Sequence, residues 1–326
     1  MKKFARILLV GALTLSLAAC GSDDKAETES VQKEAETTQV NATSEVEATD
    51  TITITDALGN THEFTEPPAT IAALSPGEMD ILLALGANVT GRPTISSDMT
   101  AEVAAIQEIG NPHEPAFETI ATVNPEVLVV PPSFMQFAKN LEGQGTKVIY
   151  SDANSIDEIQ KSIEMFGTLF QKKDEAKAIN DEIATKLSTL NTTVDVNTLL
   201  VYGAPGTYLV ALDNSLAGDI LNKAGGKNIA SDFPATDKYP SYAALSIEKI
   251  VERNPQVVMI LTHADPEAVI AGFQQQMNEN AAWKNLDAVK NDQIIILPAD
   301  LFGNNPGTKI LDSIDYMIET LQKVQQ

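Results

Sequence analysis

The sequence predicts an α/β protein with two Rossmann-like lobes of similar topology, joined by a long helix, and a ligand cleft between them. The first observation is an internal repeat: residues 118–130 and 248–260 share Glu, Ile, Asn, Pro and Val at a constant offset. The second is the alternation of short, β-rich apolar runs with helical patterns in both halves. Each half is therefore expected to form one lobe, and two facing lobes provide a concave place for a ligand.

Two further pairs of segments extend the repeat in the same order. Residues 80–86 and 219–225 both read Asp-Ile-Leu, then three residues, then Gly, and the apolar segment 147–149 matches 293–295. The repeat and the pattern between its halves divide the folded body into three parts, which are a first lobe at residues 51–154, a connecting helix at 155–192 and a second lobe at 193–326.

The N-terminal residues carry the pattern of an exported protein. Residues 1–19 begin with basic side chains and continue with an apolar run that is too short to span a bilayer, which is typical of a signal peptide. Cys20 is the only cysteine, so no intramolecular disulfide can form. Residues 20–50 are acidic and contain almost nothing large and apolar, so we expect a disordered, flexible tether.

The chain is strongly acidic, with a formal net charge of −23. Removal of a signal peptide that holds Lys2, Lys3 and Arg6 makes the rest more acidic still. Such a body does not attract nucleic acid or an anionic membrane by electrostatics. We therefore expect a monomer that binds no nucleic acid.

Short apolar runs predict the strands. Residues 51–56 and 61–64 flank a Leu-Gly-Asn turn and predict a β-hairpin. The later runs lack a polar face, which favours parallel strands that are covered by helices on both sides. These runs are residues 71–74, 127–130, 148–150, 199–202, 257–261 and 294–297.

An amphipathic pattern predicts the connecting helix. Apolar residues recur at three- and four-residue spacings from Ile156 to Leu190, and the pattern allows a break near residues 172–174. A long helix that is fixed to both lobes limits their relative movement. We therefore expect small hinge changes on ligand binding instead of a wide closure.

Ligands of parallel α/β sheets lie beyond the carboxyl ends of the strands, so the loops there hold the candidate site residues. After the strand at 71–74, Ser75 is a predicted helix N-cap, and Glu78 is its partner in a capping box. Met79 then falls in the first helical turn beside the cleft. The alternative for Met79 is an ordinary core methionine.

Three more loops supply candidates. Asp265 is a predicted N-cap, which leaves His263 in the loop and free to point across the cleft, although a solvated histidine is the alternative. Tyr208 follows a loop with two glycines that lets the backbone approach a ligand, or that simply turns the chain. Arg92 can meet an anionic group or form a surface ion pair.

These residues resemble those of the lipoprotein substrate-binding components of ABC importers for ferric siderophores, haem and cobalamin. The resemblance covers nearly everything from residue 51 onward, and it is strongest to the haem-receptor lipoproteins of the Isd type. The wider resemblance begins with the pattern at residues 54–59, and the closer match is carried by residues 203–210, 224–228 and 301–303, together with His263, Pro266 and the Trp283-Lys284 pair.

The resemblance implies that haem is the transported ligand. In that subgroup a methionine at the start of the first long helix and a histidine of a second-lobe loop hold the haem iron, and these positions fall on Met79 and His263. Thioether and imidazole are neutral donors that hold haem iron in other proteins too. The match at Met79 needs a gap of one residue. His113 stands where the close relative has a methionine, so it is a reserve ligand.

The resemblance also implies an anchor and a partner. Cys20 matches the bacterial lipobox cysteine, which receives a lipid such as palmitate and holds the protein on the outer face of the cell membrane, here of a Gram-positive bacterium. Glu118 and Glu248 match the two exposed glutamates that dock on arginines of the ABC permease. The same side chains can stabilise a helix N-terminus through the macrodipole.

Other functions make different demands. A ferric-siderophore or cobalamin receptor would share the fold and the anchor, but a trianionic catecholate calls for several arginines, and Arg92 and Arg253 are the only two beyond residue 19. A zinc or manganese receptor would gather several His and carboxylate ligands, and no His-rich loop occurs.

An exported, lipid-anchored hydrolase is the alternative from another class. The sequence contains no Gly-x-Ser-x-Gly elbow, no His-Glu-x-x-His helix and no phosphate-binding loop. We therefore expect neither catalytic residues nor a catalytic cofactor.

Overall fold

The structure is a computed structural model that describes residues 51–95, 99–141, 143, 145–190, 194–204, 206–262, 265–303 and 305–325. The predicted signal peptide, Cys20 and the predicted tether lie outside the described residues, and so does His263. The two lobes belong to one structural unit, Thr49–Gln326. None of the described helices is long and apolar enough to span a membrane.

The predicted hairpin is present at the start of the described chain. Strands β1 (Ile52–Thr55) and β2 (Thr61–Phe64) pair antiparallel, with Ile52 opposite Phe64. Alternation places the two isoleucines of β1 in the core and its two threonines in solvent. The turn is organised by the buried carboxylate of Asp56, which accepts hydrogen bonds from the amides of Leu58 and Asn60.

The first lobe contains a five-stranded sheet in the order β5-β4-β3-β6-β7, in which every pairing is parallel. Its central strand positions are fully buried because helices cover both faces, as the unbroken apolar runs predicted. The strands are β3 (Ile71–Ala73), β4 (Val89–Arg92), β5 (Gln107–Glu108), β6 (Val127–Val130) and β7 (Lys147–Tyr150). The helices of this lobe are α1 (Pro76–Ala84), α2 (Ala101–Ala105), α3 (Phe117–Val123), η1 (Pro132–Gln136) and η2 (Ala138–Leu141).

The second lobe contains a mixed sheet in the order β11-β9-β8-β12-β13, with β10 also paired to β8. Strands β8, β10, β12 and β13 are parallel, whereas β9 runs antiparallel to β8 and β11. The strands are β8 (Asn197–Ala204), β9 (Thr207–Ala211), β10 (Lys227–Asn228), β11 (Tyr242–Ala244), β12 (Val257–Leu261) and β13 (Ile294–Ile296). The antiparallel hairpin of β8 and β9 was not predicted; its turn uses Gly206 at a φ of 79°.

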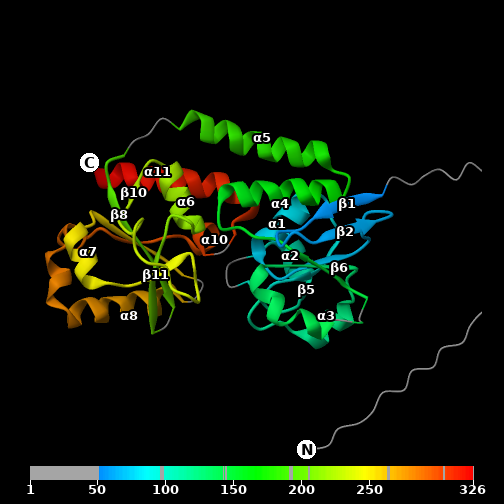
Figure 1. Cartoon of the computed structure of the whole chain (residues 1–326), viewed down its shortest axis with the longest axis horizontal. Coiled ribbons are helices and arrows are strands. Elements are labelled where there is room, and N and C mark those ends of the chain that lie inside the picture. The colour runs from blue at the N-terminus through cyan, green and yellow to red at the C-terminus, as the bar shows by residue number, and fades with distance from the viewer. Residues whose placement is uncertain are drawn as a thin grey trace, which may run out of the picture. The chain divides into compact units, whose positions relative to one another are not determined.

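Helices cover this second sheet on both faces, as they do in the first lobe (Figure 1). They are α6 (Leu216–Lys223), α7 (Ile247–Arg253), α8 (Pro266–Glu279), η3 (Ala281–Asn285), α9 (Asp287–Lys290), α10 (Ala299–Phe302), η4 (Gly307–Lys309) and α11 (Ile310–Gln325).

The sequence repeat corresponds to the same helix–turn–strand unit in each lobe. In α3–β6 and in α7–β12 the shared Ile is buried inside the helix, at Ile120 and Ile250. The shared Asn ends the helix in the left-handed conformation, with a φ of 45° at Asn124 and of 41° at Asn254. Asparagine tolerates this conformation better than most residues, which explains why it recurs at both helix ends.

The connection between the lobes is a pair of helices, α4 (Ile156–Leu169) and α5 (Lys173–Thr189), and not one long helix. The break falls next to the stretch where the sequence allowed one. Gln171 takes a φ of 56°, and the chain reverses so that the Gln160 and Asn180 side chains each bond the other residue's carbonyl. Gly167 makes the close crossing possible, because a Cβ there would lie 2.3 Å from that of Ala176.

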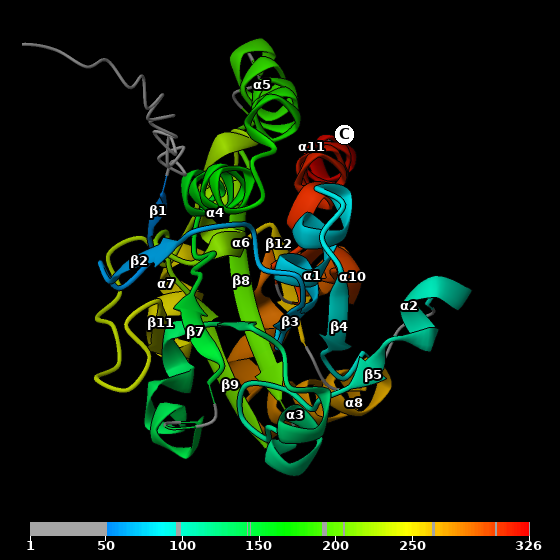
Figure 2. The ribbon, with the colours of Figure 1, turned by 90° about the vertical axis from the view of Figure 1, so that its right-hand side faces the viewer.

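One hydrophobic core runs through both lobes. It includes Val129 of the first sheet, Ile163 of α4, Leu200 of the second sheet and Leu321 of α11. Figures 1 and 2 show α4 and α11 along one side of the two sheets, where this core lies. Separation of the lobes on that side would expose buried apolar surface, which supports the expectation of small hinge movements.

Candidate functional site

A cavity of about 770 Å³ lies between the lobes at the carboxyl ends of the strands. This is the edge at which open α/β sheets bind ligands. The first lobe contributes Leu74 to Asp80 and Leu83 after β3, Thr94 and Ile95 after β4, Pro131 and Ser133 after β6, and Ser151 to Asn154 after β7. The second lobe contributes Tyr202, Ala299, Asp300, Asn305, Pro306 and Lys309.

Met79 lies at this cavity, in the first turn of α1. The residue is among those that line the cavity, yet it is only 5% exposed and its side chain packs in the core shared by the lobes. Helix α1 begins at Pro76, directly after the predicted N-cap Ser75. The start of the helix therefore sets Met79 at the floor of the cleft, with most of its surface already covered.

The predicted capping box is not formed. Ser75 makes no side-chain cap bond. Glu78 is buried, and its Oε1 accepts from Ser151 Oγ at 3.3 Å and from Asn305 Nδ2 at 3.1 Å. Burial raises the pKa of Glu78, and these hydrogen bonds offset the rise only in part. The carboxyl thus joins Ser151 of the first lobe to Asn305 of the second.

The two histidine candidates have different outcomes. His263 lies outside the described residues, so the predicted pairing of Met79 with His263 stays a prediction. His113 is exposed and lines the cavity, in a turn where the Asn111 side chain accepts from its amide at 2.9 Å. The reserve ligand is therefore placed at the cleft.

Arg92 and Tyr208 are not among the described residues that line the cavity. Arg92 is 8% exposed, and its Nη1 donates to Glu108 Oε2 and to the Pro93 carbonyl, both at 3.0 Å. Tyr208 donates its hydroxyl to the Val269 carbonyl at 2.8 Å and packs on Phe273. Each side chain is thus occupied inside its own lobe.

Tyr202 lines the cavity where Tyr208 was expected. In the β8–β9 hairpin Tyr208 stands opposite Gly203, whereas Tyr202 stands opposite Leu209. Neighbouring residues of a strand point to opposite faces, so the two tyrosines lie on different faces of the sheet. The pairing register that separates them could not be read from a hairpin that the sequence did not reveal.

The lining is rich in carboxylates and poor in cations. Asp80, Asp152 and Asp300 contribute acidic side chains, and burial raises the pKa of Asp152. Lys309 is the only Lys or Arg among the described lining residues, and its Nζ lies 3.8 Å from Asp300 Oδ2. A ligand with several negative charges would find little compensation here.

Apolar side chains form the remaining wall. Leu83 and Met99 line the cavity, and each is 37% exposed, which is unusual for large apolar residues. Ile95 and Val103 lie beside them in the lining. This wall provides a surface that a flat, apolar ligand would cover.

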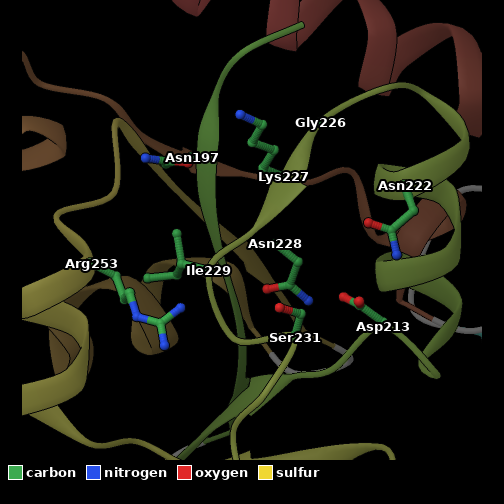
Figure 3. A pocket seen from close by; sticks show the side chains of 9 residues that line it. All are labelled: Asn197, Asp213, Asn222, Gly226, Lys227, Asn228, Ile229, Ser231 and Arg253. Carbon is green, nitrogen blue, oxygen red and sulfur yellow. The ribbon is translucent and has the colours of Figure 1, made fainter. Parts of the chain in front are cut away.

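A second cavity of about 390 Å³ lies within the second lobe (Figure 3). It sits near the amino ends of β8 and β10, away from the cleft edge, and its lining is largely polar. Its two cations are already paired, since Arg253 donates to Asp232 at 2.7 Å and Lys227 pairs with Asp195. The candidates Ser75, Met79 and His113 line the cleft, and none of them lines this cavity.

The two candidate docking residues occupy equivalent places in the lobes. Glu118 and Glu248 are both exposed in the first turns of α3 and α7, the helices of the repeated unit. This position suits the macrodipole role as well as contact with a partner.

Comparison with known proteins places the chain in a family. Residues 71–301 match the periplasmic binding protein family. The chain is 30% identical over 251 residues to the high-affinity haem uptake system protein IsdE of Staphylococcus aureus strain bovine RF122, covering 74% of this chain and 81% of that protein.

Solved structures agree with that placement. The structure of S. aureus IsdE complexed with haem matches with a TM-score of 0.69 and 26% identity, over 77% of this chain and 98% of that one. An ABC transporter substrate-binding protein from Listeria monocytogenes EGD-e matches with a TM-score of 0.67 and 25% identity, over 79% of this chain and 99% of that one.

The two-lobed α/β fold and these matches together define an extracytoplasmic substrate-binding component of ABC transport. This chain belongs to the periplasmic binding protein family, whose members bind ligands for transport and are not enzymes. Within it, the chain falls in the group that binds haem, siderophores or vitamin B12.

Proposed function

We propose that this protein captures haem at the outer face of the cell membrane and delivers it to an ABC permease for iron acquisition. The observation that carries the proposal is the place of Met79 among the residues that line the interlobe cavity, at the helix start where the haem-receptor pattern has its methionine. The relative at 30% identity is named for haem uptake, which points to the same cargo.

The described residues fit haem as cargo. A volume of about 770 Å³ lies in the range of about 300–1,000 Å³ that is usual for small-molecule sites. Leu83, Ile95 and Met99 offer apolar contact for a flat macrocycle, and the ammonium group of Lys309 can meet a carboxylate. Met79 and His263 are the proposed axial ligands, one from each lobe, with His113 in reserve.

A ferric siderophore is the second candidate, because the family fold serves it equally well. The lining opposes a strongly anionic catecholate, since Lys309 is its only described Lys or Arg and Arg92 is bound to Glu108. An uncharged hydroxamate or cobalamin does not meet this obstacle.

Delivery of the ligand would depend on a membrane anchor and on docking residues for the permease. Cys20 is the proposed lipid attachment site, which would hold the protein at the membrane close to its permease. Glu118 and Glu248 are exposed on equivalent helices of the two lobes, so both lobes can dock on the permease at once. Such contact would let the permease act on the lobes separately.

Titration of the purified protein with haem, followed through the Soret band, tests the proposal. We expect stoichiometric uptake, with a thioether–imidazole spectrum that changes in both Met79→Ala and His263→Ala. Met135→Ala is the matched control, because Met135 is 57% exposed and is not among the described lining residues. His113→Ala reports whether the reserve ligand takes part.

Two results would contradict the proposal. Unchanged spectra in both Met79→Ala and His263→Ala would reject the axial ligands. Absence of haem uptake together with tight binding of a ferric hydroxamate or of cobalamin would assign the protein to the second candidate instead.

A further inference from the structure

The N-terminal half of α1 is joined to the turn that precedes α11 in the second lobe. Asp80 Oδ2 accepts hydrogen bonds from the amide of Thr308 at 2.8 Å and from its hydroxyl at 2.6 Å. Glu78 Oε1 accepts from the side-chain amide of Asn305 at 3.1 Å. These bonds link residues that lie 227 and 228 positions apart in the chain.

Close packing accompanies these bonds. A Cβ on Gly77 would lie 2.3 Å from the carbonyl oxygen of Asn305, so only glycine fits this contact. Gly307 takes a φ of 62°, and a Cβ there would lie 2.6 Å from Asp80 Oδ2. The two lobes therefore approach closely at these points, where the glycines leave room for the Asn305 backbone and the Asp80 side chain.

The Asp80 carboxylate also accepts a hydrogen bond from a backbone amide at a helix N-terminus of the other lobe. Thr308 lies in η4, which continues directly into α11. The first N–H groups of a helix lack intrahelical partners and carry positive partial charge, so a carboxylate there is favourable. Asp80 thus caps, from the first lobe, a helical segment of the second lobe.

Met79 lies between these two anchored residues. Successive residues of an α-helix are rotated by about 100°, so Glu78 and Asp80 project to either side of the Met79 side chain. Because both neighbours are held by the second lobe, contacts outside its own lobe help to hold the backbone from which the Met79 side chain projects.

We infer that Glu78 and Asp80 are positioning residues, which set the first turn of α1, and with it the Met79 side chain, at the floor of the cleft by fastening it to residues 305–308. The role of Met79 toward haem rests on the proposed function, whereas the fastening of α1 does not. The joint also makes the floor of the cleft the fixed point about which the lobes can turn.

Variants of Asp80 separate positioning from a general loss of stability. Asp80→Ala removes the acceptor, whereas Asp80→Asn keeps an oxygen for Thr308 and should restore the wild-type behaviour. Asp219→Ala is the matched control, because Asp219 is the equivalent residue of the repeat and its Oδ2 accepts from the Ile156 amide at 2.9 Å, outside the described cavity lining.

Each full-length protein is measured in two ways. The first is the axial-ligand spectrum after haem loading, and the second is the hydrogen exchange of the α1 amides without haem. In Asp80→Ala we expect loss of the thioether signature and α1 exchange that is at least about tenfold faster. We expect Asp80→Asn and Asp219→Ala to keep the wild-type spectrum and the wild-type exchange of α1.

A wild-type spectrum and unchanged α1 exchange in Asp80→Ala would overturn the inference. So would a spectral change that Asp219→Ala reproduces in full, because a general loss of stability would then explain it. If the wild-type protein takes up no haem, the proposed function fails, and the exchange of α1 alone decides the inference: faster exchange in Asp80→Ala supports the joint, and unchanged exchange rejects it.

Discussion

Helix α1 of the first lobe and helix α6 of the second contain the same Asp-Ile-Leu sequence of the repeat, but the aspartates bind different partners. Their Ile-Leu pairs, Ile81-Leu82 and Ile220-Leu221, are fully buried in both lobes. The aspartates that precede these pairs have different partners. Asp80 accepts a hydrogen bond from Thr308 of the other lobe, whereas Asp219 accepts one from the first amide of α4. The apolar positions keep each lobe folded, and the polar position joins it to a different neighbour.

The largest expected effect tests the shared part of that comparison. Leu82→Ala and Leu221→Ala should each lower the free energy of unfolding by about 2–5 kcal/mol, because each leaves a cavity in a packed core. Leu83→Ala is the control in α1, since Leu83 is 37% exposed, and its cost should be below about 1 kcal/mol. Chemical denaturation measures all three, and a cost confined to one lobe would contradict the equivalence.

A buried carboxylate of the hairpin gives the next effect. Asp56 accepts from His62 Nε2 at 2.9 Å and from several turn amides. Burial acts to raise the pKa of Asp56, but the bonds from His62, Asn60 and Tyr150 outweigh it and hold the pKa below its ordinary value of 3.8. Asp56→Ala, which leaves these donors unpaired, should cost about 2–3 kcal/mol at neutral pH.

The sign of the pH dependence follows from the lowered pKa. The stabilisation by Asp56 is fully present above the ordinary value of 3.8 and is lost as the pH falls through the lower value of the folded state. Thermal unfolding between neutral and acidic pH should therefore show a smaller acid-side loss in Asp56→Ala than in the wild type. Parallel curves for the two proteins would contradict this account.

The repeated asparagines sharpen the comparison of the lobes. Asn124 and Asn254 both end a helix in the left-handed conformation, but the Asn254 side chain also exchanges two hydrogen bonds of 2.9 Å with Asp287. Asn124→Ala should cost about 1 kcal/mol for the backbone conformation, and Asn254→Ala about 1–2 kcal/mol more for the lost bonds. Glycine at either position removes the backbone cost, so only Asn254→Gly should remain destabilised. Equal losses in urea titrations of the two glycine variants would refute the difference.

Much of this fold was predicted from local patterns. The apolar run Val127–Val130 is a fully buried parallel strand, and the alternating run from Ile52 to Thr55 is an antiparallel strand with one buried face, because the period of the apolar residues indicates which faces are buried. The break between α4 and α5 was harder to place, since it depends on Gly167 meeting Ala176 after the chain has reversed. The spacing of residues in the sequence does not predict that contact.

The cleft was predictable in outline but not in its polar contacts. Met79 lines the cavity because it follows the end of a strand that the sequence predicted, and His113, which the resemblance suggested, lines it too. Glu78 resembles a capping-box residue locally, yet its partner Asn305 comes from the other lobe. Tyr202 takes the expected place of Tyr208 because a hairpin register decides the face. Local rules fail where partners distant in the sequence compete for the same side chain.

The smallest effect on stability concerns the equivalent glutamates. Glu118→Ala and Glu248→Ala should each lower the free energy of unfolding by only about 0.3–1 kcal/mol, which is the usual macrodipole contribution of an exposed acid in the first turn. If these residues also dock on the permease, each variant should weaken permease binding while haem uptake by the isolated protein stays unchanged.

Their separate and combined losses then compare the two lobes. Similar losses for the single variants, with a larger loss for the double variant, would indicate that both lobes engage the permease at once. Glu114→Ala is a suitable control, because Glu114 is exposed near α3 but lies outside the repeat. Permease binding that is unaffected in the double variant would leave the glutamates with the macrodipole role alone, and the lobes would then be alike at these positions for reasons of folding only.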